Sequence, residues 1–302
     1  MLLSLSVAVS LFMAAAEPPL PFPSELVDFV PYGHNPLFEG SGPGHWDEAI
    51  RERGWIMKEG DTYTMWYTGY VPGKAPVMKL GLATSTDGYT WKRYSDAPIY
   101  DRTWVEDMIV VKQGDTYYMF AEGTNDHAHL LTSTDRVQWT DRGTLDIRYA
   151  DGSPLKPGPF GTPCVLFENE VWYLFYERDD EAIWVATSKD LKTWKNIQDE
   201  PVIKRGPEPY DTKMIALNQI VKYDDCYYAY YHATAPANGP DKWTMNVAAS
   251  KDLIHWQKYP GNPIIGVDNS SGILVNDGQR YRMYCMHREV SLFLPRKNAS
   301  GK

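Results

Sequence analysis

The chain has 302 residues, a formal net charge of −9, and an aromatic content of 14% that includes 21 Tyr and 11 Trp. An acidic chain lacks the broad basic surface that contacts with phosphate groups need, so we do not expect nucleic acid as a partner. Aromatic side chains suit half-buried pleated surfaces, and 23 Gly and 22 Pro supply turns. The composition therefore indicates many short β-strands. Three cysteines are too few, and odd in number, for a disulfide framework.

The first sixteen residues are apolar and end in three alanines directly before Glu17. An apolar core followed by small residues is typical of a cleaved secretory signal peptide, and this run is too short to span a bilayer. We therefore predict a signal peptide over residues 1–16 and a single domain over residues 17–302. The mature protein is expected to be exported to the periplasm or the extracellular space, without insertion into the membrane.

One phrase, Ser-x-Asp-x-x-x-Trp, occurs four times along the chain. It starts at Ser85, Ser133, Ser188 and Ser250. Repetition at intervals of 48 to 62 residues indicates stacked copies of one supersecondary unit. We expect the Asp of each copy to cap a turn and the Trp to pack between neighbouring units.

A second pattern, a tight turn followed by an aromatic strand, precedes each phrase and occurs once more near the C-terminus. The five turns begin at Gly60, Gly114, Asn169, Asp224 and Asp277. Gly, Asn and Asp adopt the backbone conformations of hairpin turns, and alternating apolar residues follow them. Five units of four strands predict an all-β chain folded as a five-bladed β-propeller. The last unit lacks an outer strand, which residues 24–38 are expected to supply.

Catalytic groups of a propeller are expected at the mouth of the central channel, where inner strands start and second strands end. We align the units on their second-strand aromatic residues, which are Trp66, Phe120, Phe175, Tyr230 and Tyr284. One column before the inner strands repeats an aspartate, at Asp47, Asp101 and Asp211. Columns at the mouth hold Glu52, Arg53, Glu106, Asp107, Thr162, Glu122, Glu177 and His232. This mixture of polar types favours a ligand pocket, and a solvated rim is the alternative.

Two short strings place acids beside aromatic residues. Trp46-Asp47 lies in a loop rich in Gly and Pro, and Trp104 precedes Glu106-Asp107 at the start of an apolar strand. Each string combines a carboxylate with a surface on which a sugar ring can stack. Lys213 follows Asp211 and adds a cation that lowers the pKa of a nearby acid. A turn cap is the competing interpretation of Asp47, and a buried structural carboxylate is that of Glu106 and Asp107.

The sequence gives little indication of a metal or cofactor. The seven histidines lack the spacing of transition-metal ligands, and neither a Gly-rich phosphate loop nor a nucleophile elbow occurs. We therefore expect no required cofactor and no metal in the site. A structural divalent cation in the central channel is compatible with the acidic mouth, although no set of ligands identifies one.

These patterns resemble the five-bladed propeller glycoside hydrolases, the broad group that contains families 43, 117 and 130. The resemblance covers nearly all of the mature chain and rests on Trp46-Asp47, residues 63–69, residues 83–91 and Val105-Glu106-Asp107. It implies a carbohydrate substrate and cleavage of a glycosidic bond.

The resemblance also implies roles for individual residues. The base of families 43 and 117 maps to Asp47, and the catalytic Asp of the Glu-Asp-Pro-Arg string of family 130 maps to Asp107. Here Met108-Ile109 replaces the Pro-Arg that helps to hold phosphate, which favours hydrolysis over phosphorolysis. Asp211 fits a further acidic position on the fourth blade, whereas Glu177 comes from the column alignment alone.

We therefore predict an inverting glycoside hydrolase in which Asp47 is the general base and Asp107 or Glu177 protonates the leaving oxygen. Crowding of acids at the mouth is expected to raise the pKa of the general acid. The residues expected to bind or orient the sugar are Trp46, Arg53, Trp104, Glu106, Glu122, Thr162, Lys213 and His232. A non-catalytic carbohydrate-binding propeller and a glycoside phosphorylase are the alternative functions.

Overall fold

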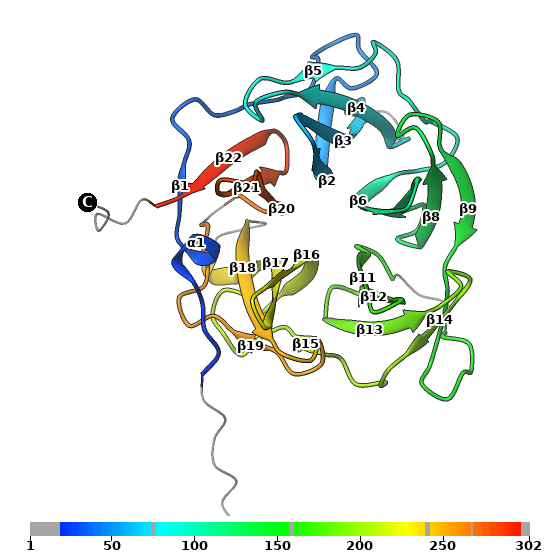
Figure 1. Cartoon of the computed structure of the whole chain (residues 1–302), viewed down its shortest axis with the longest axis vertical. Helices are drawn as coiled ribbons and strands as arrows, with labels where there is room; N and C mark the ends of the chain where they lie inside the picture. The colour runs from blue at the N-terminus through cyan, green and yellow to red at the C-terminus, as the bar shows by residue number, and fades with distance from the viewer. Residues whose placement is uncertain (1–18, 74–76, 157–159, 239–241, 267, 297–302) are drawn as a thin grey trace, which may run out of the picture.

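The strands form five sheets placed radially around a central axis (Figure 1). The computed structural model describes residues 19–73, 77–156, 160–238, 242–266 and 268–296. The prediction of an all-β, five-bladed β-propeller is confirmed. The predicted signal peptide over residues 1–16 lies outside the described residues, so its cleavage stays a prediction. Within the described ranges, no helix combines the length and the apolar character needed to cross a bilayer.

In each blade the first strand lies at the channel and later strands lie further out. Blade 1 contains β2 (Ala49–Glu59), β3 (Thr62–Tyr70), β4 (Lys79–Ser85) and β5 (Lys92–Arg93). Blade 2 contains β6 (Glu106–Gln113), β7 (Thr116–Glu122), β8 (Ala128–Ser133) and β9 (Thr140–Thr144). Blade 3 contains β11 (Cys164–Glu168), β12 (Val171–Arg178), β13 (Ala182–Ser188) and β14 (Thr193–Asn196), with β10 (Asp146–Arg148) and β15 (Ile203–Lys204) added.

The remaining two blades follow the same plan. Blade 4 contains β16 (Met214–Tyr223), β17 (Cys226–Thr234), β18 (Trp243–Ser250) and β19 (Gln257–Lys258), with the short 3-10 helix η1 (Pro236–Asn238). Blade 5 contains β20 (Gly272–Asn276), β21 (Tyr281–Met286), β22 (Val290–Pro295) and β1 (Phe29–Pro31). A short helix, α1 (Ser24–Val27), precedes β1.

The N-terminal strand closes the ring. β1 pairs antiparallel with β22, with Phe29 opposite Pro295, so both ends of the described chain complete the same blade. This confirms the prediction that residues 24–38 supply the missing outer strand. The closure is reinforced by Tyr230, whose hydroxyl donates to the Leu26 carbonyl at 2.9 Å. Because the sheet edges of the two termini are paired with each other, the ring is held shut by ladder hydrogen bonds.

The repeated Trp residues pack between blades, as predicted. Each contacts the second-strand aromatic residue of the preceding blade at ring-centroid distances of 5.8–6.3 Å. The four pairs are Trp91–Tyr284, Trp139–Trp66, Trp194–Phe120 and Trp256–Phe175. The repeated Asp caps its turn, since Asp87 Oδ1 accepts from the backbone N–H groups of Tyr89 and Thr90, each at 2.7 Å.

The starts of the inner strands are irregular at the channel. The pairing register shifts between Arg51 and Trp55 in β2 and between Glu106 and Ile109 in β6. A β-bulge bends its strand and changes the direction of the side chain at the extra residue. Asp107 lies in the second of these bulges with a φ of 43°, a conformation that few non-glycine residues adopt. The bulges therefore decide which side chains enter the channel.

Candidate functional site

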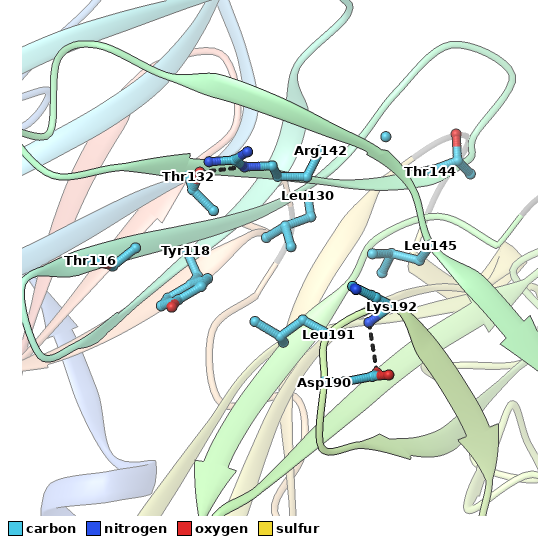
Figure 2. Close-up of a pocket in the computed structure, with 11 residues that line it drawn as sticks. Thr116, Tyr118, Leu130, Thr132, Arg142, Thr144, Leu145, Asp190, Leu191 and Lys192 are labelled. Carbon is cyan, nitrogen blue, oxygen red and sulfur yellow. Dashed lines mark hydrogen bonds between the residues drawn. The ribbon is translucent and has the colours of Figure 1, made fainter.

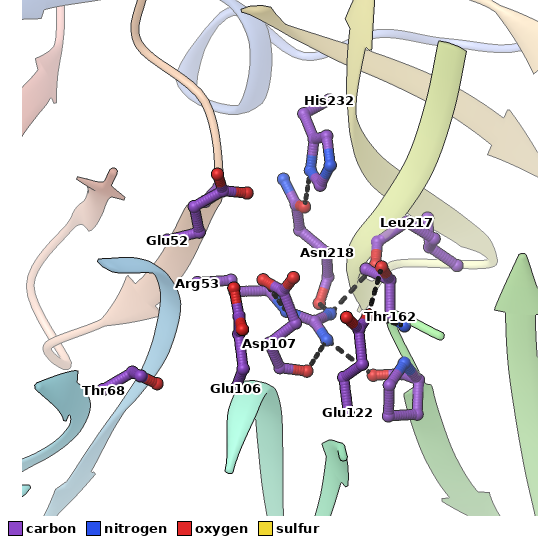
Figure 3. A network of polar contacts seen from close by, with 12 residues as sticks. Glu52, Arg53, Thr68, Glu106, Asp107, Glu122, Thr162, Leu217, Asn218 and His232 are labelled. Carbon is purple, nitrogen blue, oxygen red and sulfur yellow. Dashed lines mark hydrogen bonds and ion pairs between the residues drawn. The ribbon is translucent and has the colours of Figure 1, made fainter. Parts of the chain in front are cut away.

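Carboxylates from three blades meet in a cavity of about 430 Å³ at the central channel. Seven of its lining residues lie in the polar columns found from the sequence: Glu52, Glu106, Asp107, Glu122, Thr162, Glu177 and His232. Five others were not: Arg51, Asp126, Asp179, Asp180 and Trp243. Figure 3 shows how the labelled acids converge from separate strands. The channel mouth thus gathers many of the predicted polar residues around one space.

Burial makes these acids hard to ionise. Loss of hydration raises the pKa of Glu106 and of Glu177 to about 8, that of Glu52 to about 7 and that of Asp180 to about 6. The pKa of Asp107 is raised by the same cause. The charge of Asp107 is the second cause of the raised pKa of Glu52, Glu106 and Asp180, so Asp107 is the electrostatic centre of the cavity.

Glu106 is held in place from both sides. Its carboxylate pairs with the guanidinium of Arg51, and it accepts from Trp104 Nε1 at 2.9 Å. Trp104, which was expected to stack on a sugar, thus orients an acid, and its ring borders a neighbouring hollow of about 180 Å³. Because Arg51, the single arginine of the cavity lining, is paired with Glu106, the other acids of the cavity have no arginine partner within that lining.

Two further acids bind backbone N–H groups of the loops around them. Glu122 Oε2 accepts from the N–H of Thr162 at 2.9 Å. Glu177 accepts through one oxygen from Gly161 N–H at 3.0 Å and through the other from Asp180 N–H at 2.7 Å. Glu177 therefore fixes the turn that carries Asp180, which places the carboxylate of Asp180 at the cavity.

Asp107 differs from these acids because, among the described residues, one of its oxygens accepts no hydrogen bond. Asp107 Oδ1 is buried without a hydrogen bond within the described part of the chain. Arg53 Nε, also buried without a hydrogen bond there, lies 3.9 Å away. A buried acid whose oxygen is not fixed by a donor is free to hold a proton and to donate it.

Arg53 lies beneath the cavity and connects four blades. Its side chain is fully buried, and its two terminal nitrogens donate to four backbone carbonyl oxygens (Figure 3). The acceptors belong to Leu217 and Asn218 at 2.9 and 2.8 Å, Pro163 at 2.9 Å, and Asp107. The expectation that Arg53 contacts the sugar therefore differs from the structure, in which this cation fastens the inner strands together.

His232 is neutral and presents one defined tautomer. Burial lowers its pKa to about 3, so the ring carries no charge at neutral pH. Its Nδ1 lies 2.5 Å from Asn218 Oδ1, which accepts, so Nδ1 carries the hydrogen. Nε2 is therefore left as an acceptor, and the residue lines the cavity. A hydroxyl group of a sugar is a suitable donor for it.

The structure does not bring Asp47 and Asp211 to this cavity. Asp47 Oδ2 accepts from the Tyr67 hydroxyl at 3.0 Å and from Arg93 Nε at 2.8 Å. Asp211 Oδ2 accepts from Lys258 Nζ at 2.6 Å. The prediction that both acids converge with Asp107 is therefore wrong. Each acid instead binds a cation on the outermost strand of its own blade, in β5 for Asp47 and in β19 for Asp211.

Two neighbours of these acids also lie elsewhere. Trp46 stacks on Tyr67 at a ring-centroid distance of 5.9 Å, within blade 1. Lys213 is exposed, and neither residue lines the acidic cavity. The contacts of Asp47 and Asp211 are those of buried carboxylates that join strands within a blade.

We expect Asp47→Asn to act on stability rather than on turnover. The buried carboxylate loses a charge-assisted hydrogen bond from Arg93, which should lower the free energy of unfolding by about 1–3 kcal/mol. Urea denaturation measures this change, and kcat on a responsive glycan should stay within a few-fold of wild type. Asp101→Asn, which changes an exposed acid of the same column, is the matched control. A thousand-fold loss of kcat in Asp47→Asn would restore the role of general base.

The acids missed from the sequence occupy turns. Asp126 and Asp180 lie between the second and third strands of blades 2 and 3, with φ of 55° and 54°. Asp and Asn are common wherever a turn needs positive φ, so nothing in the sequence separates a cavity acid from a turn former. The sequence does contain a signal that Asp47 and Asp211 have cation partners within their own blades. Arg93 and Lys258, the partners in question, both follow a repeated Trp by two residues.

A larger hollow, of about 570 Å³, lies between blades 2 and 3 (Figure 2). It is lined by Tyr118, Leu130, Leu145 and Leu191 together with short polar side chains and two cations, and its single carboxylate is Asp190. Asp190 caps a turn, so this hollow lacks the paired acids of the channel. Among the residues that the structure describes, no group of three or more His, Cys, Asp or Glu side chains is arranged to hold a metal ion.

The fold and the acidic channel define a class of protein: a five-bladed β-propeller related in structure to glycoside hydrolases and phosphorylases of family 130 and to a family 43 propeller. A glycosyl hydrolase from Bacteroides ovatus aligns with a TM-score of 0.75 and 16% identity over 91% of this chain and 95% of that one. A β-1,2-mannobiose phosphorylase from Listeria innocua aligns with a TM-score of 0.67 and 15% identity over 88% and 95%. At these identities the likeness shows the fold.

Curated proteins give a likeness in sequence. An uncharacterized protein of Mycobacterium tuberculosis (strain CDC 1551 / Oshkosh) is 28% identical over 204 residues, which cover 60% of this chain and 66% of that protein. A 1,2-β-oligomannan phosphorylase of Thermoanaerobacter sp. (strain X514) is 27% identical over 177 residues, which cover 54% and 55%. The chain thus spans less than two thirds of the length of these relatives. No protein-family model matches the chain.

Proposed function

We propose that this protein is a carbohydrate-active enzyme that hydrolyses a glycosidic bond in the acidic cavity of the channel. The observation that carries the proposal is the composition of that cavity: eight of its twelve lining residues are Asp or Glu, and its one arginine is paired with Glu106. Hydrolysis of a glycoside needs one carboxyl group as acid and one as base, and burial has separated the pKa values of these acids.

In the proposed mechanism Asp107 is the general acid. It gives its proton to the leaving oxygen as the bond from that oxygen to the anomeric carbon breaks. Asp180, whose pKa of about 6 leaves it ionised at neutral pH, accepts a proton from the water that attacks the anomeric carbon. Glu177, the other acid candidate from the sequence, holds two backbone N–H groups instead. We retain inversion of the anomeric carbon as part of this proposal.

Phosphorolysis is the second candidate function, because a curated relative is a 1,2-β-oligomannan phosphorylase. The charge of the cavity opposes it. A phosphate dianion would enter a space lined by eight acidic residues, where each ionised carboxylate, Asp180 among them, repels it and burial weakens screening. Water carries no charge and is the better nucleophile for this cavity.

A product analysis tests the function. The protein is incubated with β-1,2-mannobiose and with plant and algal oligosaccharides, with and without inorganic phosphate, and product anomers are read by NMR. We expect free sugars of inverted configuration at a rate that does not depend on phosphate. A sugar 1-phosphate would establish phosphorolysis instead. Tight binding by calorimetry without any product over days would establish a non-catalytic binding propeller.

The raised pKa values predict the pH profile. Asp180 must be ionised to act as base, so kcat/KM should fall as the pH drops below about 6 and Asp180 takes up a proton. Asp107 must be protonated to act as the acid. Burial raises its pKa, so activity should be lost as the pH rises through that pKa and Asp107 gives up its proton. Initial rates across the pH range measure both limbs. A kcat/KM that holds constant from pH 7 to pH 4.5 would exclude Asp180 as the base.

Export and cofactor use are proposals that rest on the sequence. We propose that residues 1–16 direct export, which N-terminal sequencing of protein recovered outside the cytoplasm would check by showing Glu17 as the first residue. The mechanism above uses no cofactor. A structural cation in the channel stays a prediction.

A further inference from the structure

A second lobe of about 270 Å³ opens directly beside the acidic cavity. The two share Arg51, Glu52 and Trp243, so a ligand bound in one lies next to the other. The new lining residues of the second lobe are Ile50, Tyr70, His287 and Arg288. They come from blade 1 and from the turn between β21 and β22 of blade 5.

The two lobes differ in charge. The second lobe contains two arginines and a single carboxylate, that of Glu52, whereas the first contains eight carboxylates. Arg51 is paired with Glu106. Arg288 is exposed, and within the described part of the chain its guanidinium makes no hydrogen bond or ion pair. Among the described residues of the second lobe, Arg288 is therefore the cation that has no hydrogen-bond or ion-pair partner, and Glu52 is the acid whose pKa its charge lowers.

The other groups of the second lobe suit a sugar ring. Trp243 and Tyr70 provide aromatic surface with a polar tip, the kind of surface on which carbohydrate rings stack. His287 Nδ1 lies 4.0 Å from Glu52 Oε1, which connects these two groups across the lobe. A pocket that combines aromatic walls with one cation that has no ion-pair partner selects ligands by both shape and charge.

We propose that the second lobe is a subsite for a sugar residue that carries a carboxylate, a uronic acid, joined to the residue held in the acidic cavity. The inference rests on the proposed carbohydrate function and adds the substrate class. Arginine binds a carboxylate through two parallel hydrogen bonds, and a single carboxylate would supply the ion-pair partner that Arg288 lacks among the described residues. A phosphate dianion would need a second free cation, which this lobe does not offer.

Substrate pairs that differ in charge alone test the subsite. Oligosaccharides that contain glucuronate or galacturonate are compared with their carboxyl-reduced forms, in which the carboxylate has become a neutral alcohol. In wild type we expect kcat/KM to favour the charged form, and in Arg288→Gln we expect this preference to shrink at least tenfold. Arg142→Gln, in the hollow of Figure 2, is the matched control and should keep the wild-type preference. Equal preference in wild type and Arg288→Gln would overturn the inference.

Calorimetry with the same pairs separates this inference from the proposed hydrolysis. Binding that favours the charged form and depends on Arg288, without any cleavage, would refute hydrolysis and support the subsite. Cleavage of neutral oligosaccharides with no gain from a carboxylate would support hydrolysis and refute the subsite. Inorganic phosphate that competes with the uronate and is consumed in turnover would show that the second lobe holds a phosphate, which also refutes the subsite.

Discussion

Asp107→Asn should lower kcat on an oligosaccharide by about 10²–10⁴-fold, the contribution that a positioned general acid makes. The amide has the shape of the acid but no proton to give to the leaving oxygen. The site around it should stay intact, because Asp107 Oδ1 has no hydrogen bond to lose within the described residues and its backbone carbonyl still accepts from Arg53. Initial rates on the best substrate from the panel measure the effect.

The leaving group supplies an internal control for this variant. A dinitrophenyl glycoside departs without protonation, so Asp107→Asn should cleave it at a rate much closer to that of wild type. Asp101→Asn, an exposed acid at the start of the same blade, should leave both substrates unaffected. An equal loss on both substrates would mean that Asp107 does not act as the acid, and full activity on the oligosaccharide would remove it from the mechanism.

Arg53→Met should lower the free energy of unfolding by about 4 kcal/mol or more, because Arg53 is the buried donor to four backbone carbonyl oxygens. Methionine fills part of the space but donates nothing, so four carbonyl oxygens that Arg53 now binds would lose that donor. Each buried polar group left without a partner costs about 1–3 kcal/mol. Asp107 would also lose the nearest cation. Equilibrium urea denaturation measures the change.

Two variants show whether the effect comes from this geometry. Arg53→Lys keeps the charge but lacks the planar guanidinium that reaches carbonyl oxygens of three blades. We therefore expect its free energy of unfolding to lie between those of wild type and Arg53→Met. Arg296→Met removes an exposed arginine that pairs with Asp28, and exposed pairs contribute at most about 1 kcal/mol. If Arg53→Met unfolds at the same urea concentration as wild type, the contacts of Arg53 with the four carbonyl oxygens do not stabilise the propeller.

The number of blades and the strands in each blade could be predicted because both depend on short repeated sequence patterns. Each Ser-x-Asp-x-x-x-Trp phrase fixes a turn through hydrogen bonds within three residues, so its geometry depends little on the rest of the chain. The missing outer strand of blade 5 followed from counting strands, and β1 fills that place. Periodicity and turn chemistry act over short distances, and for that reason they are readable from sequence.

The candidate site was predictable only in part. Glu106, Asp107, Glu122, Thr162 and Glu177 were found because they interrupt apolar strands at matching positions of several blades. Asp47 and Asp211 also occupy one aligned position before the inner strands of their blades. An alignment of blades does not show, however, whether the side chain at a position points into the channel or away from it. Their partners, Arg93 and Lys258, lie 46 and 47 residues further along the chain. Both carboxylates bind these cations, and neither lines the acidic cavity.

The sequence alone determined the number of blades, their order and the closure of the ring, because repeated turns and alternating apolar residues specify these locally. Only the tertiary structure decided that Arg53 binds the inner strands rather than a sugar and that Asp180 and Arg288 face connected lobes. These outcomes depend on bulges at the starts of inner strands and on contacts between distant blades. Both set the direction of a side chain, and direction is a property of the assembled ring.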